Sequence, residues 1–67
     1  MGKKLLYYVI PKESFKAEGR FFLERKKYPV YENDGYNRLI AENGEFNFSE
    51  KLMPKVIEEW ELEVVEI

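Results

Sequence analysis

The sequence contains no cysteine and no histidine among its 67 residues. Without cysteine, no disulfide can reinforce the fold, and the usual thiolate and imidazole ligands of a structural zinc site are missing. Histidine is also the side chain most often used in general acid–base catalysis. The hydroxyl candidates Ser14 and Ser49 are better explained as caps of turns. We therefore expect no metal site, no cofactor and no enzymatic activity.

Long apolar runs are missing as well. No stretch approaches the roughly 20 apolar residues that a membrane-spanning helix needs. Residues 5–10 form an apolar run near the amino terminus, but it is too short for a secretory signal, and Pro11, Lys12 and Glu13 follow it without a small-residue cleavage site. We expect a cytoplasmic protein with no membrane association.

Aromatic residues and charge are abundant. Five Tyr, five Phe and one Trp make eleven aromatics, which can supply much of the core of one small domain spanning residues 1–67. Residues 1–31 carry eight Lys or Arg and three Glu (+5), whereas residues 32–67 carry three basic and ten acidic side chains (−7), which sum to the net charge of −2. Such a split indicates internal complementarity or two faces of opposite sign.

The amino-terminal half predicts two strand regions separated by a loop. Residues 4–10, "KLLYYVI", are rich in β-branched and aromatic side chains and predict a strand. Residues 11–19 predict a long loop with a helical turn capped by Ser14. Residues 20–35 predict strands interrupted by the charged run 24–27. Pro29 places this stretch at a sheet edge or a bulge, because proline cannot donate a ladder hydrogen bond.

Two turns are marked by their sequences. Asn33, Asp34 and Gly35 indicate the first. In the second, Asn43-Gly44 joins residues 36–42 to residues 45–48 and predicts a type I′ hairpin turn, which requires a positive φ at both central residues.

The spacing of apolar residues in the carboxyl-terminal segment is compatible with either a helix or a strand. Ser49 caps a short turn, which Pro54 is expected to stop. A helix over the last twelve residues would align Ile57, Trp60, Val64 and Ile67. A strand would point Trp60, Leu62 and Val64 inward and Glu59, Glu61 and Glu63 outward, with a bulge at Val65 returning Ile67 to the core. The strand leaves fewer apolar residues unexplained, so it is the preferred prediction.

The resulting order predicts an all-β fold with a short helical turn, a five-stranded SH3-like small barrel. The run "ERKKYPVYENDGYNRLIAENGEFNFSEKLM" resembles the core of small SH3-like proteins of phages and prophages of Gram-positive bacteria. The resemblance is carried by Lys26-Lys27, Tyr28, Val30, Asp34-Gly35, Leu39-Ile40, Asn43-Gly44 and Phe48-Ser49. It covers about 30 residues, does not account for residues 11–19, and implies a fold in families that mostly lack an assigned activity.

These features predict a non-enzymatic interaction module that binds another protein, such as a phage accessory or host-modulating factor. The candidate contacts are the acidic row Glu59, Glu61 and Glu63, together with Tyr31 and Tyr36. The acidic row also suits an edge strand guarded by charge or, at alternate strand positions, a phosphate-backbone mimic.

Two alternatives remain open. A nucleic-acid-binding barrel would use Arg25, Lys26, Lys27 and Tyr28, since small barrels bind strands through aromatics beside basic grooves. A self-assembling structural protein would join the basic half of one copy to the acidic half of the next.

Overall fold

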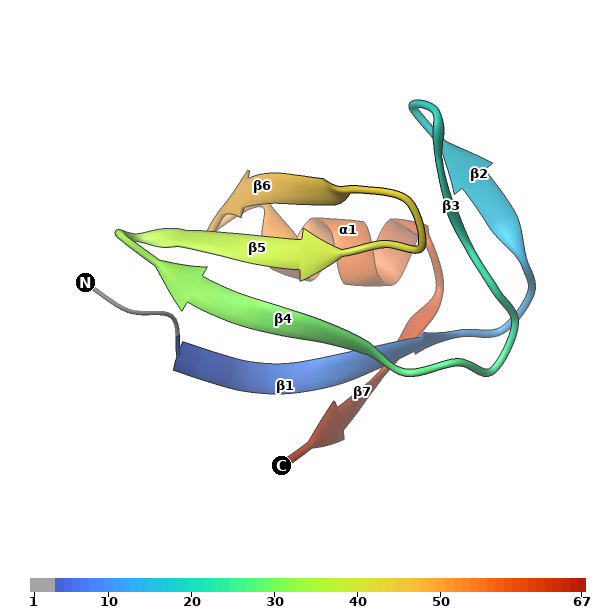
Figure 1. Ribbon diagram of the computed structural model, residues 1–67. Helices are drawn as coiled ribbons and strands as arrows, with labels where there is room; N and C mark the ends of the chain where they lie inside the picture. Colours follow the sequence, from blue (N-terminus) through green and yellow to red (C-terminus); the bar gives the residue numbers. More distant parts are fainter. Residues whose placement is uncertain (1–3) are drawn as a thin grey trace.

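The computed structural model describes residues 4–67. In these residues seven strands and one helix follow one another (Figure 1). They are β1 (Lys4–Pro11), β2 (Phe15–Ala17), β3 (Arg20–Phe22), β4 (Tyr28–Asn33), β5 (Tyr36–Ile40), β6 (Glu45–Ser49), α1 (Met53–Glu59) and β7 (Leu62–Glu66).

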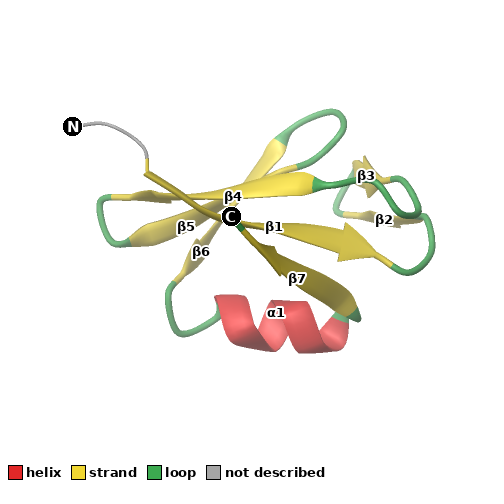
Figure 2. Cartoon of the chain, turned by 90° about the horizontal axis from the view of Figure 1, so that it is seen from below, coloured by secondary structure: helices red, strands yellow, loops and turns green. Residues whose placement is uncertain are grey.

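Five strands form one antiparallel sheet in the order β6-β5-β4-β1-β7, and β2 and β3 form a separate hairpin. The all-β prediction is therefore confirmed at the level of the sheet. The edge strands β6 and β7 do not pair with each other within residues 4–67, so the sheet does not close into the predicted barrel. Helix α1 connects these two edges and lies against one face of the sheet (Figure 2).

The core lies between this face of the sheet, α1 and the β2–β3 hairpin. Its fully buried side chains come from the sheet, from β3 and from α1, and are Phe22, Leu39, Met53, Val9, Val30 and Pro11. Aromatic rings form one side of the core, with Trp60 between 5.3 and 6.0 Å from four phenylalanine rings. The burial of these rings stabilises a fold that, without cysteine, has no disulfides to reinforce it.

The turn between β4 and β5 confirms the prediction for residues 33–35. Asn33 pairs with Tyr36, and the two residues between them, Asp34 and Gly35, have φ angles of 51° and 82°. Two consecutive positive φ angles are the signature of the type I′ turn, whose twist matches that of the strands it joins.

The β5–β6 hairpin is present, but its predicted turn type is wrong. The ladder ends at the pair Ile40–Glu45, and the Ala41 N–H donates to the Gly44 carbonyl at 2.7 Å. Neither Asn43 nor Gly44 has a positive φ. The loop is longer than a two-residue turn because the Asn43 side chain binds another segment, as described below.

The prediction of a loop with a helical turn at residues 11–19 is also wrong. This region enters the β2–β3 hairpin, whose type I′ turn is formed by Glu18 (φ 51°) and Gly19 (φ 79°). Ser14 does not cap a helix. Its hydroxyl accepts a hydrogen bond from the Glu24 N–H at 2.8 Å, which ties the start of the hairpin to the chain that follows it.

Pro29 does not lie on an edge strand, because β4 is the centre of the sheet. It pairs with Tyr8 of β1, but the ladder with β5 begins one residue later, at Val30. The missing N–H of proline therefore interrupts no bond on the β5 side. The irregularity in this part of the sheet lies in β1, between Leu5 and Tyr7.

The carboxyl-terminal segment is a helix followed by a turn and a strand, so the prediction of a strand throughout is wrong for residues 56–61. Pro54 stands in the first turn of α1, where its missing N–H leaves no bond unmade, and does not stop the turn. The predicted bulge at Val65 is absent, since β7 pairs with β1 in unbroken register. Ile67 is 74% exposed and does not return to the core.

Candidate functional site

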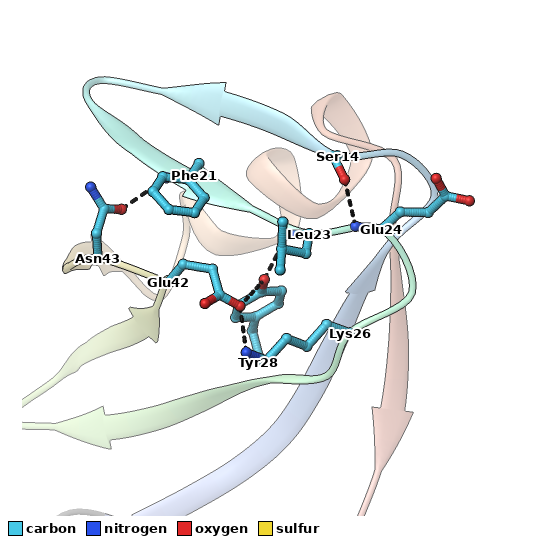
Figure 3. A network of polar contacts seen from close by, with 8 residues as sticks. All are labelled: Ser14, Phe21, Leu23, Glu24, Lys26, Tyr28, Glu42 and Asn43. Atoms are coloured by element: carbon cyan, nitrogen blue, oxygen red, sulfur yellow. Dashed lines mark hydrogen bonds and ion pairs between the residues drawn. The ribbon is translucent and has the colours of Figure 1, made fainter.

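The β5–β6 loop holds the β2–β3 hairpin in place. The Asn43 side chain accepts a hydrogen bond from the Phe21 N–H at 3.0 Å (Figure 3). The same side chain donates a hydrogen bond to the Gly19 carbonyl at 2.9 Å, and the Glu42 N–H donates to the Phe21 carbonyl at 3.1 Å. These three bonds fix β3 against the end of the main sheet. They explain why asparagine stands at a position that does not use its tolerance for a positive φ.

A second network joins the β3–β4 connection to the same loop. The Tyr28 hydroxyl accepts a hydrogen bond from the Leu23 N–H at 2.6 Å and donates one to the Glu42 carboxylate at 2.7 Å, while Lys26 forms an ion pair with that carboxylate (Figure 3). Burial is the main cause that raises the pKa of Tyr28 to about 12; the Leu23 N–H, the next largest influence, lowers it, and the hydrogen bond and charge of Glu42 raise it. Hydrogen bonds from Lys26 and then Tyr28 lower the pKa of Glu42.

The residues of the nucleic-acid alternative do not form a stacking surface. Tyr28 is 3% exposed and lies in the core, so its ring cannot stack on a base, and this part of the prediction is wrong. Lys26 is paired with Glu42, Arg25 lies 3.5 Å from Glu24, and the Lys27 ammonium lies 5.5 Å from the centre of the Tyr8 ring. The three cations are neighbours in the chain but contact three different groups.

The predicted acidic row does not exist, because its members lie on three different elements. Glu59 is the last residue of α1, Glu61 lies in the connection to β7 with a φ of 52°, and Glu63 lies in β7. A strand would have repeated its side chains every second residue, but the helix ends inside this stretch. Glu63 lines a separate cavity with Ile10 and Arg25.

Glu59 and Glu61 do meet at a pocket of about 310 Å³ between the chain entering β2 and the end of α1. We call this the acidic–aromatic pocket. Its walls come from two segments far apart in sequence, and its lining residues are Lys12, Glu13, Ser14, Phe15, Glu59, Trp60 and Glu61. Figure 1 shows the end of α1 on the same side of the molecule as the β2–β3 hairpin.

The three carboxylates of the pocket are unpaired. Glu13, Glu59 and Glu61 form no ion pair and no side-chain hydrogen bond within residues 4–67, whereas the carboxylates of Glu24, Glu42 and Glu45 each lie beside a cation. Lys12 is the one cationic residue in the lining, so the pocket carries a formal charge of −2. This surplus favours a positively charged ligand.

The chain places these charges where they are locally unfavourable. The carboxyl end of a helix carries partial negative charge and favours cations, yet the last turn of α1 has no basic residue and ends in Glu58 and Glu59. Glu61 adopts a left-handed backbone conformation, which glycine adopts without steric strain. Local rules are most often broken at functional sites.

The aromatic wall of the pocket is closely packed. Trp60 packs between Phe15 at 5.3 Å and Phe46 at 5.5 Å, with Phe22 and Phe48 each at 6.0 Å. The indole N–H has no acceptor within residues 4–67 and is not fully enclosed, so it can donate to a ligand. The pocket therefore offers an aromatic surface and three unpaired carboxylates.

Tyr31 and Tyr36 lie elsewhere. Their partners in the ladder, Arg38 and Asn33, show that both belong to the sheet face opposite the core. Tyr36 is 54% exposed and lines a cavity of about 340 Å³ with Asn33, Asp34, Arg38 and Asn47. The predicted partner contacts are thus divided among three regions, and only Glu59 and Glu61 share a pocket.

Sequence reasoning missed Glu13, Phe15 and Trp60 as parts of one site. Trp60 was assigned to the core, which is correct for most of its ring but overlooks its accessible part. The available signal was the run "EEWE" at residues 58–61, where an aromatic residue stands among three carboxylates. Nothing in the sequence showed that residues 12–15 would lie opposite it.

Within residues 4–67, no three Cys, His, Asp or Glu side chains group closely enough to hold a metal ion. The same residues contain no helix with the length and apolar character needed to cross a bilayer. Comparison with family models, with curated proteins and with solved structures gives no match for this chain. The resemblance to SH3-like phage proteins accordingly stays a prediction.

Proposed function

We propose that this protein is a small, non-enzymatic interaction module that binds a positively charged segment of another protein in the acidic–aromatic pocket. The observation that carries the proposal is the juxtaposition of Phe15 and Trp60 with three unpaired carboxylates in one pocket. Interfaces are anchored by a few side chains that fill such pockets, and complementary charge adds specificity and speeds association.

The proposal extends to fold and setting. The strand order β6-β5-β4-β1-β7, with a helix before the last strand, supports an SH3-like arrangement of the sheet. A role as a phage accessory or host-modulating factor rests on the sequence resemblance alone. The absence of cysteine suits the reducing cytoplasm, where we place the protein.

The single tryptophan makes the test direct, because Trp60 lines the pocket and is the only indole fluorophore in the chain. The probe is a nine-residue glycine-rich peptide with alternating Arg and Lys, titrated at 50 mM and 150 mM salt. We expect a saturable change in Trp60 emission that weakens at the higher salt, since exposed charge pairs are screened.

The matched variants separate the pocket from general attraction. Glu59→Gln combined with Glu61→Gln should weaken binding about three- to tenfold, the size expected for two partly exposed ion pairs. Glu66→Gln, on β7 and outside the pocket lining, should leave binding within experimental error. No emission change at 50 mM salt, or equal weakening by the double variant and the control, would count against the proposal.

A further inference from the structure

The acidic–aromatic pocket combines a tryptophan ring packed among phenylalanine rings with carboxylate-bearing residues from two segments of the chain. We propose that the side chain it recognises is arginine, in an extended segment of the partner protein. This inference rests on the proposed function and narrows it, because lysine would satisfy the charge of the pocket but not its shape.

The first argument concerns Trp60. Indole gives the strongest cation–π attraction of the natural aromatic rings. The four phenylalanine rings around Trp60 hold its plane in place before any ligand arrives, so little side-chain entropy is lost on binding. A guanidinium is planar and weakly hydrated and can stack on such a ring, whereas an ammonium is compact and strongly hydrated.

The second argument concerns the carboxylates. Glu13 precedes β2, while Glu59 ends α1 and Glu61 follows it, so the carboxylate-bearing residues of the lining come from two segments far apart in the sequence. A guanidinium presents five N–H donors in a fixed fork and can bond two carboxylates while it stacks. Lysine has three donors around one point and cannot stack and bridge in the same way.

The third argument concerns size. A cavity of about 310 Å³ is at the lower limit of small-ligand pockets. A shallow pocket of this size suits one long side chain presented by an extended segment.

The test compares three peptides of identical length in a Gly-Ser background, each carrying two Arg, two Lys or two Gln. Binding to the full-length protein is followed by Trp60 emission and by the NMR shift of the Trp60 indole N–H. We expect the Arg peptide to bind about five- to tenfold more tightly than the Lys peptide, and the Gln peptide to give no saturable change. Glu13→Gln should reduce the preference for Arg, with Glu66→Gln as the matched control.

The outcomes distinguish this inference from the function on which it rests. Equal affinity for the Arg and Lys peptides, with the indole signal shifting for both, would overturn arginine recognition and leave the basic-partner proposal standing. Failure of both peptides to bind at low salt would overturn both. If backbone amide shifts recorded in the same NMR titration are confined to Tyr31 and Tyr36 and the Trp60 indole signal does not move, binding lies on the opposite sheet face and the pocket is rejected.

Discussion

Among residues 4–67, four residues other than glycine have a positive φ, and they are Glu18, Arg25, Asp34 and Glu61. Glu18 and Asp34 stand before glycines in type I′ turns, where the hairpin requires this conformation. The Arg25 N–H donates to the Pro11 carbonyl at 3.0 Å, so its conformation is held by a tertiary bond. Glu61 follows α1, at a position where helices often carry glycine. Glu61 therefore places a carboxylate at the pocket in a backbone conformation that is less stable for glutamate than for glycine.

Replacement of Glu61 by glycine should therefore stabilise the fold and weaken binding. Glycine removes the backbone strain of a left-handed non-glycine residue, and this gain outweighs the greater conformational entropy that glycine gives to the unfolded chain. We expect a net gain of about 1 kcal/mol in the free energy of unfolding. The affinity for the Arg peptide should fall at the same time. Urea unfolding and Trp60 emission measure the two effects.

Glu18→Gly is the control for this substitution, because Glu18 (φ 51°) has nearly the same backbone conformation as Glu61 (φ 52°) but lies at the tip of the β2–β3 hairpin. It should give a similar gain in stability without a change in affinity. If Glu61→Gly binds the peptide as tightly as the unsubstituted protein, the Glu61 carboxylate is not part of the site.

At the scale of elements, the attachment of the β2–β3 hairpin to the β5–β6 loop depends on glycine at position 44. A Cβ at Gly44 would lie 2.9 Å from Nε of Arg20 and 3.2 Å from its Cγ. That side chain has little freedom to move, since its guanidinium lies 5.1 Å from the Phe46 ring centre and its Nε is buried. Glycine is needed here for space and not for a positive φ.

Gly44→Ala should accordingly lower the free energy of unfolding by about 1–2 kcal/mol through overpacking. The measurement is urea unfolding followed by circular dichroism. In an Arg20→Ala background the same substitution should cost little, because the obstructing atoms are gone. A full loss in both backgrounds would show that the backbone at position 44, and not Arg20, is responsible.

The turns show which elements the sequence could predict. Residues 33–35 were predicted correctly because a two-residue turn is encoded locally. Asn43-Gly44 has an equally strong local signal, yet Asn43 bonds Phe21 and Gly19 and the type I′ geometry is not formed. The hairpin at Glu18-Gly19 was missed for the opposite reason, since its strands of three residues are too short to show a period. The first case was decided by tertiary bonds that sequence reasoning cannot see, and the second by strands too short to carry a pattern.

The site was predictable only in part, for a related reason. The acidic residues at the carboxyl end were conspicuous, and Glu59 and Glu61 belong to the pocket. The change from helix to strand occurs within two residues of Trp60, and a single period fitted to residues 56–67 could not represent it. The opposite wall, Glu13 and Phe15, is brought there by packing of the hairpin, which no local pattern encodes.

At the scale of the molecule, the basic and acidic halves neutralise each other only at one described ion pair. Lys26–Glu42 joins the halves, whereas Arg25–Glu24 and Arg38–Glu45 each lie within one half. Most charges of each sign are therefore left for solvent or partners. Assembly through opposite halves stays a prediction, and the free carboxylates around Trp60 are the part of this surplus with a defined shape.

The same ion pair belongs to the network of Tyr28, Glu42 and Lys26, which links the β3–β4 connection, β4 and the β5–β6 loop. Its contribution to stability should depend on pH at both extremes. The pKa of Glu42 is lowered in the folded state, so its contribution is present above the unfolded value and is lost as the pH falls through the folded one.

Tyr28 should determine how stability falls at alkaline pH. Its pKa rises from 10.0 to about 12 on folding, so between these values the folded state holds a proton that the unfolded state has released. Stability must then fall as the pH rises, and the contribution of Tyr28 is fully present only below pH 10. Tyr28→Phe should be less stable than the unsubstituted protein at pH 8, because the Leu23 N–H loses its acceptor and Glu42 loses a donor. The two urea midpoints should converge between pH 10 and pH 12. Tyr36→Phe, on the exposed sheet face, should lose stability between pH 10 and pH 12 as the unsubstituted protein does. If the difference in urea midpoint between Tyr28→Phe and the unsubstituted protein stays constant up to pH 12, the Tyr28 hydroxyl does not set the alkaline loss of stability.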